Sequence, residues 1–297
     1  MADELVTGLL KDSDLRVLVA TTSDLSQKAR QLHSLAPTSA ALLAQGLTGG
    51  LLYAALQKSA ARINLQLECD GPLRGLFVDA ESDGSARGYV KNPLVAIESA
   101  GEFRWRPALG NKGFLSVLRD VGNGEFFRSS VELEFLDVAL DLERYFKVSD
   151  QLQTFVALEA VATADDSLGA VAGIFLQPLP SGDLEVFNRL SDRLRDESAL
   201  KKALKAGNRS AAALTTALVA SGDLEILSRI PLSFRCTCSI ERVRRAVRVM
   251  GQEELEDILR KERRAEATCQ FCSTRYVVEE AELRQMLEKM VAAGVER

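Results

Sequence analysis

Histidine is nearly absent from this chain, whose 297 residues include only one, His33. A metal site with several imidazole ligands is therefore excluded, although imidazole is among the commonest metal ligands in proteins. Five cysteines are present instead. Thiolates are thus the ligands to consider first if this protein binds a metal.

The N-terminal segment also lacks the features of a secretory signal. MADELVTGLLKDSDL carries acidic residues where a signal needs basic ones, and it has neither a long apolar run nor a cleavage site. We therefore expect a cytoplasmic protein, in which thiols are kept reduced and paired cysteines are metal ligands or redox switches. No Walker motif for ATP binding is present.

An excess of basic residues is missing as well. The formal net charge is -5 and the sequence pI is about 5.3, which argues against a nucleic-acid binder held mainly by phosphate contacts. The hydrophobic fraction of 46% and the charged fraction of 27% are ordinary for a globular protein with a real core. The length predicts two or three structural units.

One long stretch, His33–Gln57, contains no Asp, Glu, Lys or Arg, and its length would allow it to cross a membrane. It nevertheless contains Pro37 and the glycines Gly46, Gly49 and Gly50, and no basic cluster flanks it. We therefore predict a helix that is buried on all sides in a protein core, without membrane association. Its small residues would let neighbouring backbones approach closely.

Residues 1–180 show the strand and turn patterns of a mixed domain. The expected strands are Leu15–Thr21, Ile63–Cys69, Leu73–Ala80, Ala86–Val90, Phe114–Asp120, Glu125–Glu132, Phe155–Val161 and Ala170–Leu176, and the expected helix is Phe135–Phe146. The expected turns are Asp70–Pro72, Asp83–Gly84, Gly122–Gly124 and Asp165–Ser167. Hairpins grouped around helices indicate an α+β fold rather than a doubly wound parallel sheet.

Composition changes after a turn at Pro178–Gly182, and residues 181–234 are predicted to form a helical linker. Apolar residues recur at helical spacing along its first part, at Leu184, Phe187, Leu190 and Leu194. Because short helices are marginally stable alone in water, this stripe needs a partner surface. We expect the linker to pack on the first domain, with a break near Gly207.

The last segment, 235–297, contains at least three short helical patterns and four of the five cysteines. Cys236 and Cys238 are separated by one residue, and Cys269 and Cys272 by two. Zinc takes four ligands in a tetrahedron, and a Cys-x-x-Cys turn directs two sulfurs at one metal. Because His33 is distant in sequence, we predict one structural zinc ion bound by these four thiolates, with no open position for catalysis.

Other interpretations of the cysteines are unconnected buried thiols and an inert zinc module. Both spacings also permit internal disulfides, which close readily at i,i+3 but lie near the geometric limit at i,i+2. Oxidants attack thiolates, so oxidation would eject the zinc. A segment of about 60 residues depends on such a metal for its fold. Cys69, on the apolar face of a strand, is expected to be buried and inert.

Three motifs, the first of which begins one residue before the last segment, fit a known family. They are Phe234-Arg235-Cys236-Thr237-Cys238, then Glu253-Glu254-Leu255, then Thr268-Cys269-Gln270-Phe271-Cys272 followed by Tyr276. The segment closely resembles the redox-switch domain of the bacterial thirty-three-kilodalton heat-shock chaperones. Further matches at Leu67–Leu73 and Leu136–Gln151 extend the resemblance over nearly the whole chain.

The resemblance implies a redox-regulated holdase, not an enzyme. In such proteins the reduced, zinc-bound form is folded and inactive. Peroxide with heat, or hypochlorous acid, would convert Cys269–Cys272 and Cys236–Cys238 to disulfides and release the zinc. Segment 235–297 and then the linker would unfold, exposing a surface that holds unfolding client proteins until ATP-dependent chaperones receive them. Members of the family dimerise through the core domain when active.

Two other functions are consistent with parts of the sequence. A dithiol oxidoreductase would use Cys269 and Cys272, but that motif usually opens a helix after a strand, and the other cysteine pair would have no role. Turnover in an insulin-reduction assay would favour this enzyme. A zinc-dependent adaptor or nucleic-acid-binding module would instead show salt-dependent binding to an oligonucleotide.

The zinc assignment predicts that His33→Ala leaves the metal content unchanged at one zinc per reduced chain. The physical reason is that four thiolates already complete the coordination of the metal. Metal analysis of the purified reduced variant measures this directly. A large loss of zinc in His33→Ala would overturn the four-cysteine assignment.

Overall fold

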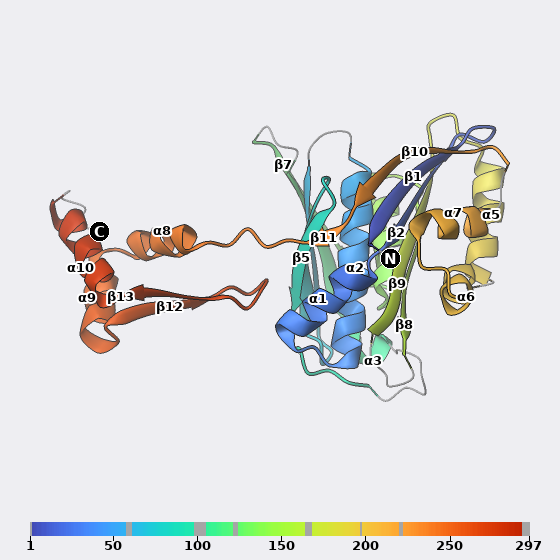
Figure 1. Ribbon diagram of the computed structural model, residues 1–297. Coiled ribbons are helices and arrows are strands. Elements are labelled where there is room, and N and C mark those ends of the chain that lie inside the picture. The colour runs from blue at the N-terminus through green and yellow to red at the C-terminus, as the bar shows by residue number, and fades with distance from the viewer. Residues whose placement is uncertain are drawn as a thin grey trace. The chain divides into compact units, whose positions relative to one another are not determined.

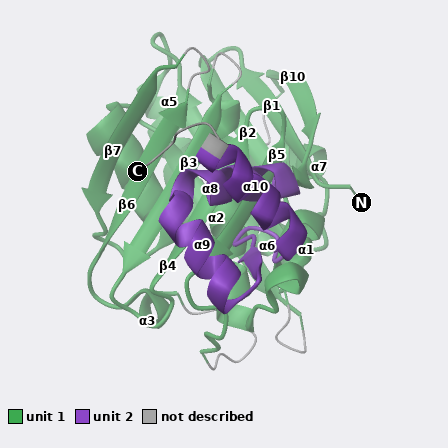
Figure 2. Ribbon diagram, turned by 90° about the vertical axis from the view of Figure 1, so that its left-hand side faces the viewer, with its two compact units in different colours: residues 1–235 green, residues 236–297 purple. Residues whose placement is uncertain are grey.

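The computed structural model describes residues 2–57, 61–97, 105–120, 124–163, 168–196, 198–219 and 222–292. Two compact units are present, residues 1–235 (unit 1) and residues 236–297 (unit 2), coloured separately in Figure 2. Helices combine with mainly antiparallel sheets, so the expected α+β class is confirmed.

Unit 1 is built on two sheets. Sheet A contains β1 (Glu4–Leu10), β2 (Leu15–Thr21), β8 (Phe155–Ala162), β9 (Leu168–Pro178) and β10 (Leu224–Pro231). Sheet B contains β3 (Arg62–Cys69), β4 (Gly75–Glu81), β5 (Ser85–Val90), β6 (Gly113–Asp120), β7 (Phe126–Glu132) and β11 (Ser233–Phe234). The strand orders are β10-β1-β2-β9-β8 and β11-β5-β4-β3-β6-β7. Neighbours are antiparallel except β11 and β5.

A buried helix, α2 (Pro37–Ala55), lies between the two sheets (Figure 1). Its glycines permit the close approach on both sides: a Cβ at Gly46 or Gly50 would meet Val78 of sheet B, and a Cβ at Gly49 would meet Leu158 of sheet A. The expected all-round burial is therefore confirmed, with a start at Pro37. No helix among the described residues is long and apolar enough to cross a membrane.

The remaining helices of the first 180 residues are α1 (Ser23–His33), α3 (Arg106–Leu109), α4 (Val138–Tyr145) and the π-helical turn η1 (Phe146–Asp150). His33 is the last residue of α1 rather than part of the buried helix, which corrects the expected boundary. Every expected strand is present within a few residues of its predicted bounds. The turn at 165–167 and residues 122–123 of another lie outside the described residues.

The linker packs on the outer face of sheet A through α5 (Leu184–Asp196), α6 (Ala199–Lys205) and α7 (Ala211–Val219) (Figure 1). Phe187, Leu190 and Leu194 join the buried cluster of that face, as predicted, whereas Leu184 is 49% exposed. The helical prediction is wrong at its end, because β10 pairs with β1 and β11 pairs with β5. Since α2 covers the other face, β2 is buried on both faces.

Unit 2 consists of α8 (Ile240–Met250), α9 (Gln252–Lys261), β12 (Arg264–Thr268), β13 (Arg275–Glu279) and α10 (Glu280–Ala292). The three helices agree with the sequence prediction, whereas the β12–β13 hairpin was not predicted. Its buried apolar cluster is small and comprises Val247, Leu255, Val278, Leu283 and Met286. So small a core makes unit 2 marginal in stability without further cross-links.

The close approach of α2 to sheet B predicts that Gly50→Val destabilises unit 1 by about 1–3 kcal/mol, the usual cost of overpacking a core. The added Cβ would lie 3.0 Å from Cγ1 of Val78. Urea unfolding followed by the fluorescence of the single tryptophan, Trp105, measures the change. Gly222→Val is the control, because no atom lies within 4 Å of a Cβ there; equal effects would contradict the packing account.

Candidate metal centre

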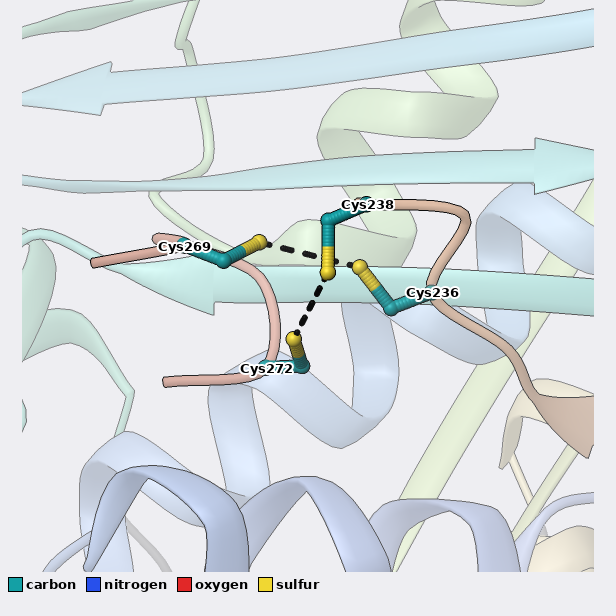
Figure 3. Close-up of side chains that lie close together, drawn as sticks. All are labelled: Cys236, Cys238, Cys269 and Cys272. Atoms are coloured by element: carbon teal, nitrogen blue, oxygen red, sulfur yellow. Dashed lines mark hydrogen bonds between the residues drawn. The ribbon is translucent and has the colours of Figure 1, made fainter. Parts of the chain in front are cut away.

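The four clustered cysteines come from two segments of unit 2 (Figure 3). Cys236 and Cys238 lie in the extended stretch between β11 and α8, and Cys269 and Cys272 lie in the turn between β12 and β13. The four Sγ atoms all lie within 4.8 Å of one another. The close pairs join the two segments: Cys236 to Cys269 at 3.7 Å and Cys238 to Cys272 at 3.3 Å.

These distances fit one tetrahedral zinc ion. With zinc–sulfur bonds of about 2.3 Å, the edge of a tetrahedron of sulfurs is about 3.8 Å. The observed separations of 3.3 and 3.7 Å are close to that edge. They are far longer than a disulfide bond, which is about 2.05 Å. The four cysteines could therefore hold a metal ion, and all four are half-buried.

Backbone hydrogen bonds shape the Cys269–Cys272 turn. The Cys269 N–H donates to the Thr274 carbonyl at 2.9 Å, and the Ser273 N–H donates to the Cys269 carbonyl at 2.8 Å. Ser273 takes the left-handed conformation with φ 57°, which glycine adopts at lower cost. The backbone N–H groups of Phe271 and Cys272 also point at the Cys269 sulfur.

The other cysteine pair is held between two fixed points in the sequence. After it, the Ser239 hydroxyl accepts from the Arg242 N–H at 3.4 Å and caps α8. Before it, Arg235 is attached to the edge of sheet B. Its N–H donates to the Ala86 carbonyl at 2.9 Å, and its guanidinium contacts the Asp83 carboxylate at 2.5 Å. The last residue of unit 1 before the cysteine pair is therefore attached to sheet B.

The thiols of the cluster ionise unequally. Partial burial is the largest cause that raises the pKa of Cys238 to about 12; the Tyr276 hydroxyl, 3.0 Å away, opposes it, and the neighbouring sulfurs add to it. Burial likewise raises the pKa of Cys269. Burial opposes ionisation of Cys272 too, but hydrogen bonds with the Thr274 hydroxyl and backbone lower its pKa to about 7.

Four adjacent thiolates repel one another, so full ionisation needs a cation at their centre. This donor set, together with the distances, fits a thiolate-bound divalent metal. Sequence reasoning assigned no role to Tyr276, Thr274 or Arg235, although Tyr276 and Arg235 lie within the motifs. Their contacts with sulfur or with sheet B depend on the folded hairpin and on the β11–β5 pairing.

The fifth cysteine and the histidine lie in unit 1. Cys69, at the end of β3, is half-buried rather than fully buried as predicted, and partial burial raises the pKa of its thiol. A raised pKa lowers the thiolate fraction at neutral pH, and the thiolate is the form that oxidants attack. His33 is half-buried at the end of α1.

The geometry predicts opposite results for two cysteine variants. Cys238→Ser should lose most of the bound zinc, because a hydroxyl replaces one of four thiolates, whereas Cys69→Ser should keep both zinc and the response to oxidants. Zinc released by a thiol-modifying reagent and quantified with a metal dye measures both. Zinc loss in Cys69→Ser without unfolding would contradict the inert role of that thiol.

Comparisons with known proteins agree with this architecture. The family model described as "Hsp33 protein" matches residues 3–279. A 33 kDa chaperonin of Listeria monocytogenes is 32% identical over 292 residues, covering 97% of this chain and 99% of that protein. A 33 kDa chaperonin of Synechocystis is 34% identical over 303 aligned positions, covering 100% of both chains.

A solved structure is similar throughout as well. The crystal structure of the 33 kDa chaperonin of Thermotoga maritima, a heat shock protein 33 homologue, superposes with a TM-score of 0.86 at 26% identity. The match covers 98% of this chain and 100% of that one. Because the family model and these relatives span nearly the entire sequence, the chain belongs to the Hsp33 family.

Proposed function

We propose that this protein is a redox-regulated holdase of the cytoplasm, inactive when reduced and zinc-bound and active when oxidised. The proposal assigns zinc to Cys236, Cys238, Cys269 and Cys272. It divides the chain into a core of residues 1–180, a linker of residues 181–234 and a switch segment of residues 235–297.

The observation that carries the proposal is the connection between the sulfur cluster and an apolar surface. The linker helices cover the outer face of sheet A, where Val17, Val19 and Ile174 are fully buried. The same linker leads through β11 and Arg235 directly into Cys236. Oxidation of the cysteines can therefore affect the linker helices that cover this apolar face, because the same stretch of chain joins the two.

In the reduced state the four cysteines would hold zinc as thiolates. The metal supplies cross-linking between the stretch before α8 and the β12–β13 turn, a contribution worth roughly 10–16 kcal/mol in small zinc domains. Unit 2 needs such a contribution, because its buried cluster contains only a few side chains in the described residues. The zinc has four protein ligands and no open position, so its role is structural.

Oxidation removes the ligands. One equivalent of peroxide takes two electrons from the thiolates of Cys269 and Cys272 and two protons from solvent, forming one disulfide and two waters, and a second equivalent does the same for Cys236 and Cys238. Disulfide sulfurs no longer carry the charge that binds the metal, so zinc dissociates. The i,i+3 pair closes with less strain than the i,i+2 pair, so we expect Cys269–Cys272 to form first.

Loss of the metal would unfold unit 2 and loosen the linker. The outer face of sheet A then loses its cover of Phe187, Leu190 and Leu194. A contiguous exposed apolar surface is a typical protein-binding site. Unfolding proteins are the expected ligands, ATP-dependent chaperones are the expected receivers of the held clients, and the oxidised form is expected to be a homodimer.

The disulfide-exchange enzyme is less well supported. Cys269 and Cys272 lie in a turn between two strands, whereas the dithiol motif of oxidoreductases opens a helix. The sulfurs of the other pair lie within 4.8 Å, which a two-thiol enzyme does not require. Efficient turnover of insulin disulfides by the reduced protein would favour this enzyme over the holdase.

The proposal predicts that the oxidised protein suppresses aggregation of a chemically denatured client, measured by light scattering, and that the reduced zinc form does not. Leu190→Ala should lower the temperature at which oxidised protein becomes active, because it removes a buried contact worth about 2 kcal/mol or more. Leu184→Ala is the matched control, since Leu184 is 49% exposed and Leu190 is 8% exposed. Equal activity of the reduced and oxidised forms would refute redox control.

A further inference from the structure

The outer strand of sheet A, β10, is the last long element of the linker. It pairs antiparallel with β1 from Glu4↔Pro231 to Leu10↔Leu224, with a register shift between Thr7 and Gly8. Backbone bonds continue at one end, where the Leu232 N–H donates to the Asp3 carbonyl at 3.0 Å. The pairing therefore extends along the whole length of β1.

The two paired strands differ sharply in side-chain burial. Leu5, Val6 and Leu10 of β1 are at most 3% exposed, and β1 also pairs with β2 on its other side. Along β10, Ile226 is 39% exposed and Leu227 is 53% exposed, and no residue is fully buried. Thus β1 is fixed in the core by its side chains, whereas β10 is held mainly by its backbone.

This asymmetry determines what remains when the linker detaches. Release of β10 costs the core few apolar contacts, while β1 stays in place between β2 and an empty edge. An unpaired edge strand presents a row of N–H and C=O groups that can pair with another chain. Because these groups belong to the backbone, the pairing does not depend on the side chains of the chain that is added.

We infer that the β1 edge of the released core binds an extended segment of an unfolding protein, which adds as a strand in the position that β10 leaves. This inference rests on the proposed holdase function and names its client site. The bound segment is about seven residues long and free of proline in its interior, because proline cannot donate to the ladder.

Two features of the edge favour a sequence-tolerant occupant. The strand that fills it in the folded protein exposes most of its side chains, so the position imposes few side-chain requirements. Gly8, at the register shift, has no Cβ; one built there would lie 2.9 Å from Leu224 and 3.2 Å from the Glu225 carbonyl. A backbone can therefore come close at this point whatever side chains it carries.

The apolar face beside the edge adds affinity without adding selectivity. Val6 and Leu10 of β1 belong to the cluster that the linker helices cover. An added strand directs every second side chain to that face, where apolar residues of an unfolding protein would be buried. The competing occupants are the tethered β10 itself and the β10 of a second copy.

The test uses the full-length oxidised, zinc-free protein and three synthetic peptides. The first has the sequence of residues 224–230, the second has the same residues in reverse order, and the third is the first peptide with every backbone nitrogen methylated. Fluorescence anisotropy gives the affinities, and hydrogen exchange by mass spectrometry reports protection of residues 4–10.

Strand addition predicts that the forward and reversed peptides bind with similar affinity and slow amide exchange in residues 4–10. The methylated peptide should lose most of its binding, although it is more apolar. Equal binding of the methylated peptide would assign clients to the apolar face alone and overturn the inference. If only the forward peptide binds, the edge is specific for the sequence of β10, and its partner would be the β10 of a second copy. That result would also overturn the inference.

A pair of linker variants provides a second measurement. Neighbouring residues of an edge strand direct their N–H groups alternately toward and away from the partner strand. Of Arg229→Pro and Ile230→Pro, which lie in the regular register beyond the shift, the one that removes an N–H facing β1 should weaken the tethered competitor and tighten peptide binding by roughly 2- to 10-fold. The other proline variant should change the peptide affinity little. An unchanged peptide affinity in both variants would contradict competition at the edge.

Failure of this inference is distinguishable from failure of the proposed function. If the oxidised protein suppresses client aggregation while residues 4–10 remain unprotected with every peptide, the holdase function stands and the edge site is wrong. If oxidation neither suppresses aggregation nor increases exchange in β10, the linker is not released, and both the function and the client site are refuted.

Discussion

The crowding of four cysteine sulfurs in unit 2 is the constraint on which the proposed switch depends, because four thiolates at this spacing would repel one another. The sulfurs lie within 4.8 Å of one another, and such a group is stable as four thiolates only around a cation, or else as protonated thiols or disulfides. Backbone hydrogen bonds around Cys269 and the cap of α8 hold the sulfurs in this arrangement. We therefore expect the stability of unit 2, which has a small core, to change with the chemical state of its cysteines.

Unit 1 depends instead on the burial of apolar side chains, and a single core layer does not cover all of its apolar surface. Sheet A is apolar on both faces: α2 covers one and the linker helices cover the other. The glycines of α2 bring both sheets close to it, so the inner layer is tightly packed. The outer layer consists of α5, the short helices α6 and α7, and a strand with exposed side chains, so we expect it to detach at lower cost than the inner layer.

Sequence patterns predicted the elements whose conformation follows from the burial or metal-binding chemistry of their side chains. The uncharged stretch around α2 is buried as predicted, β2 has the predicted bounds, and the spacing of the four cysteines predicted that they cluster. The strand β10 was missed because its side chains are largely exposed and its conformation comes from pairing with β1. The β12–β13 hairpin was missed because its strands are five residues long and only alanine occupies the less exposed positions of β12.

Coupling between the cysteines and the linker is tested most directly by following three events in one sample treated with mild peroxide at low and then high temperature. Zinc release is followed with a metal dye, linker opening by protease cleavage within residues 183–229, and holdase activity by client aggregation. We predict zinc release at low temperature while the linker remains protected by its contacts with sheet A, then cleavage and activity on heating. Linker cleavage with full activity before any zinc is released would contradict it.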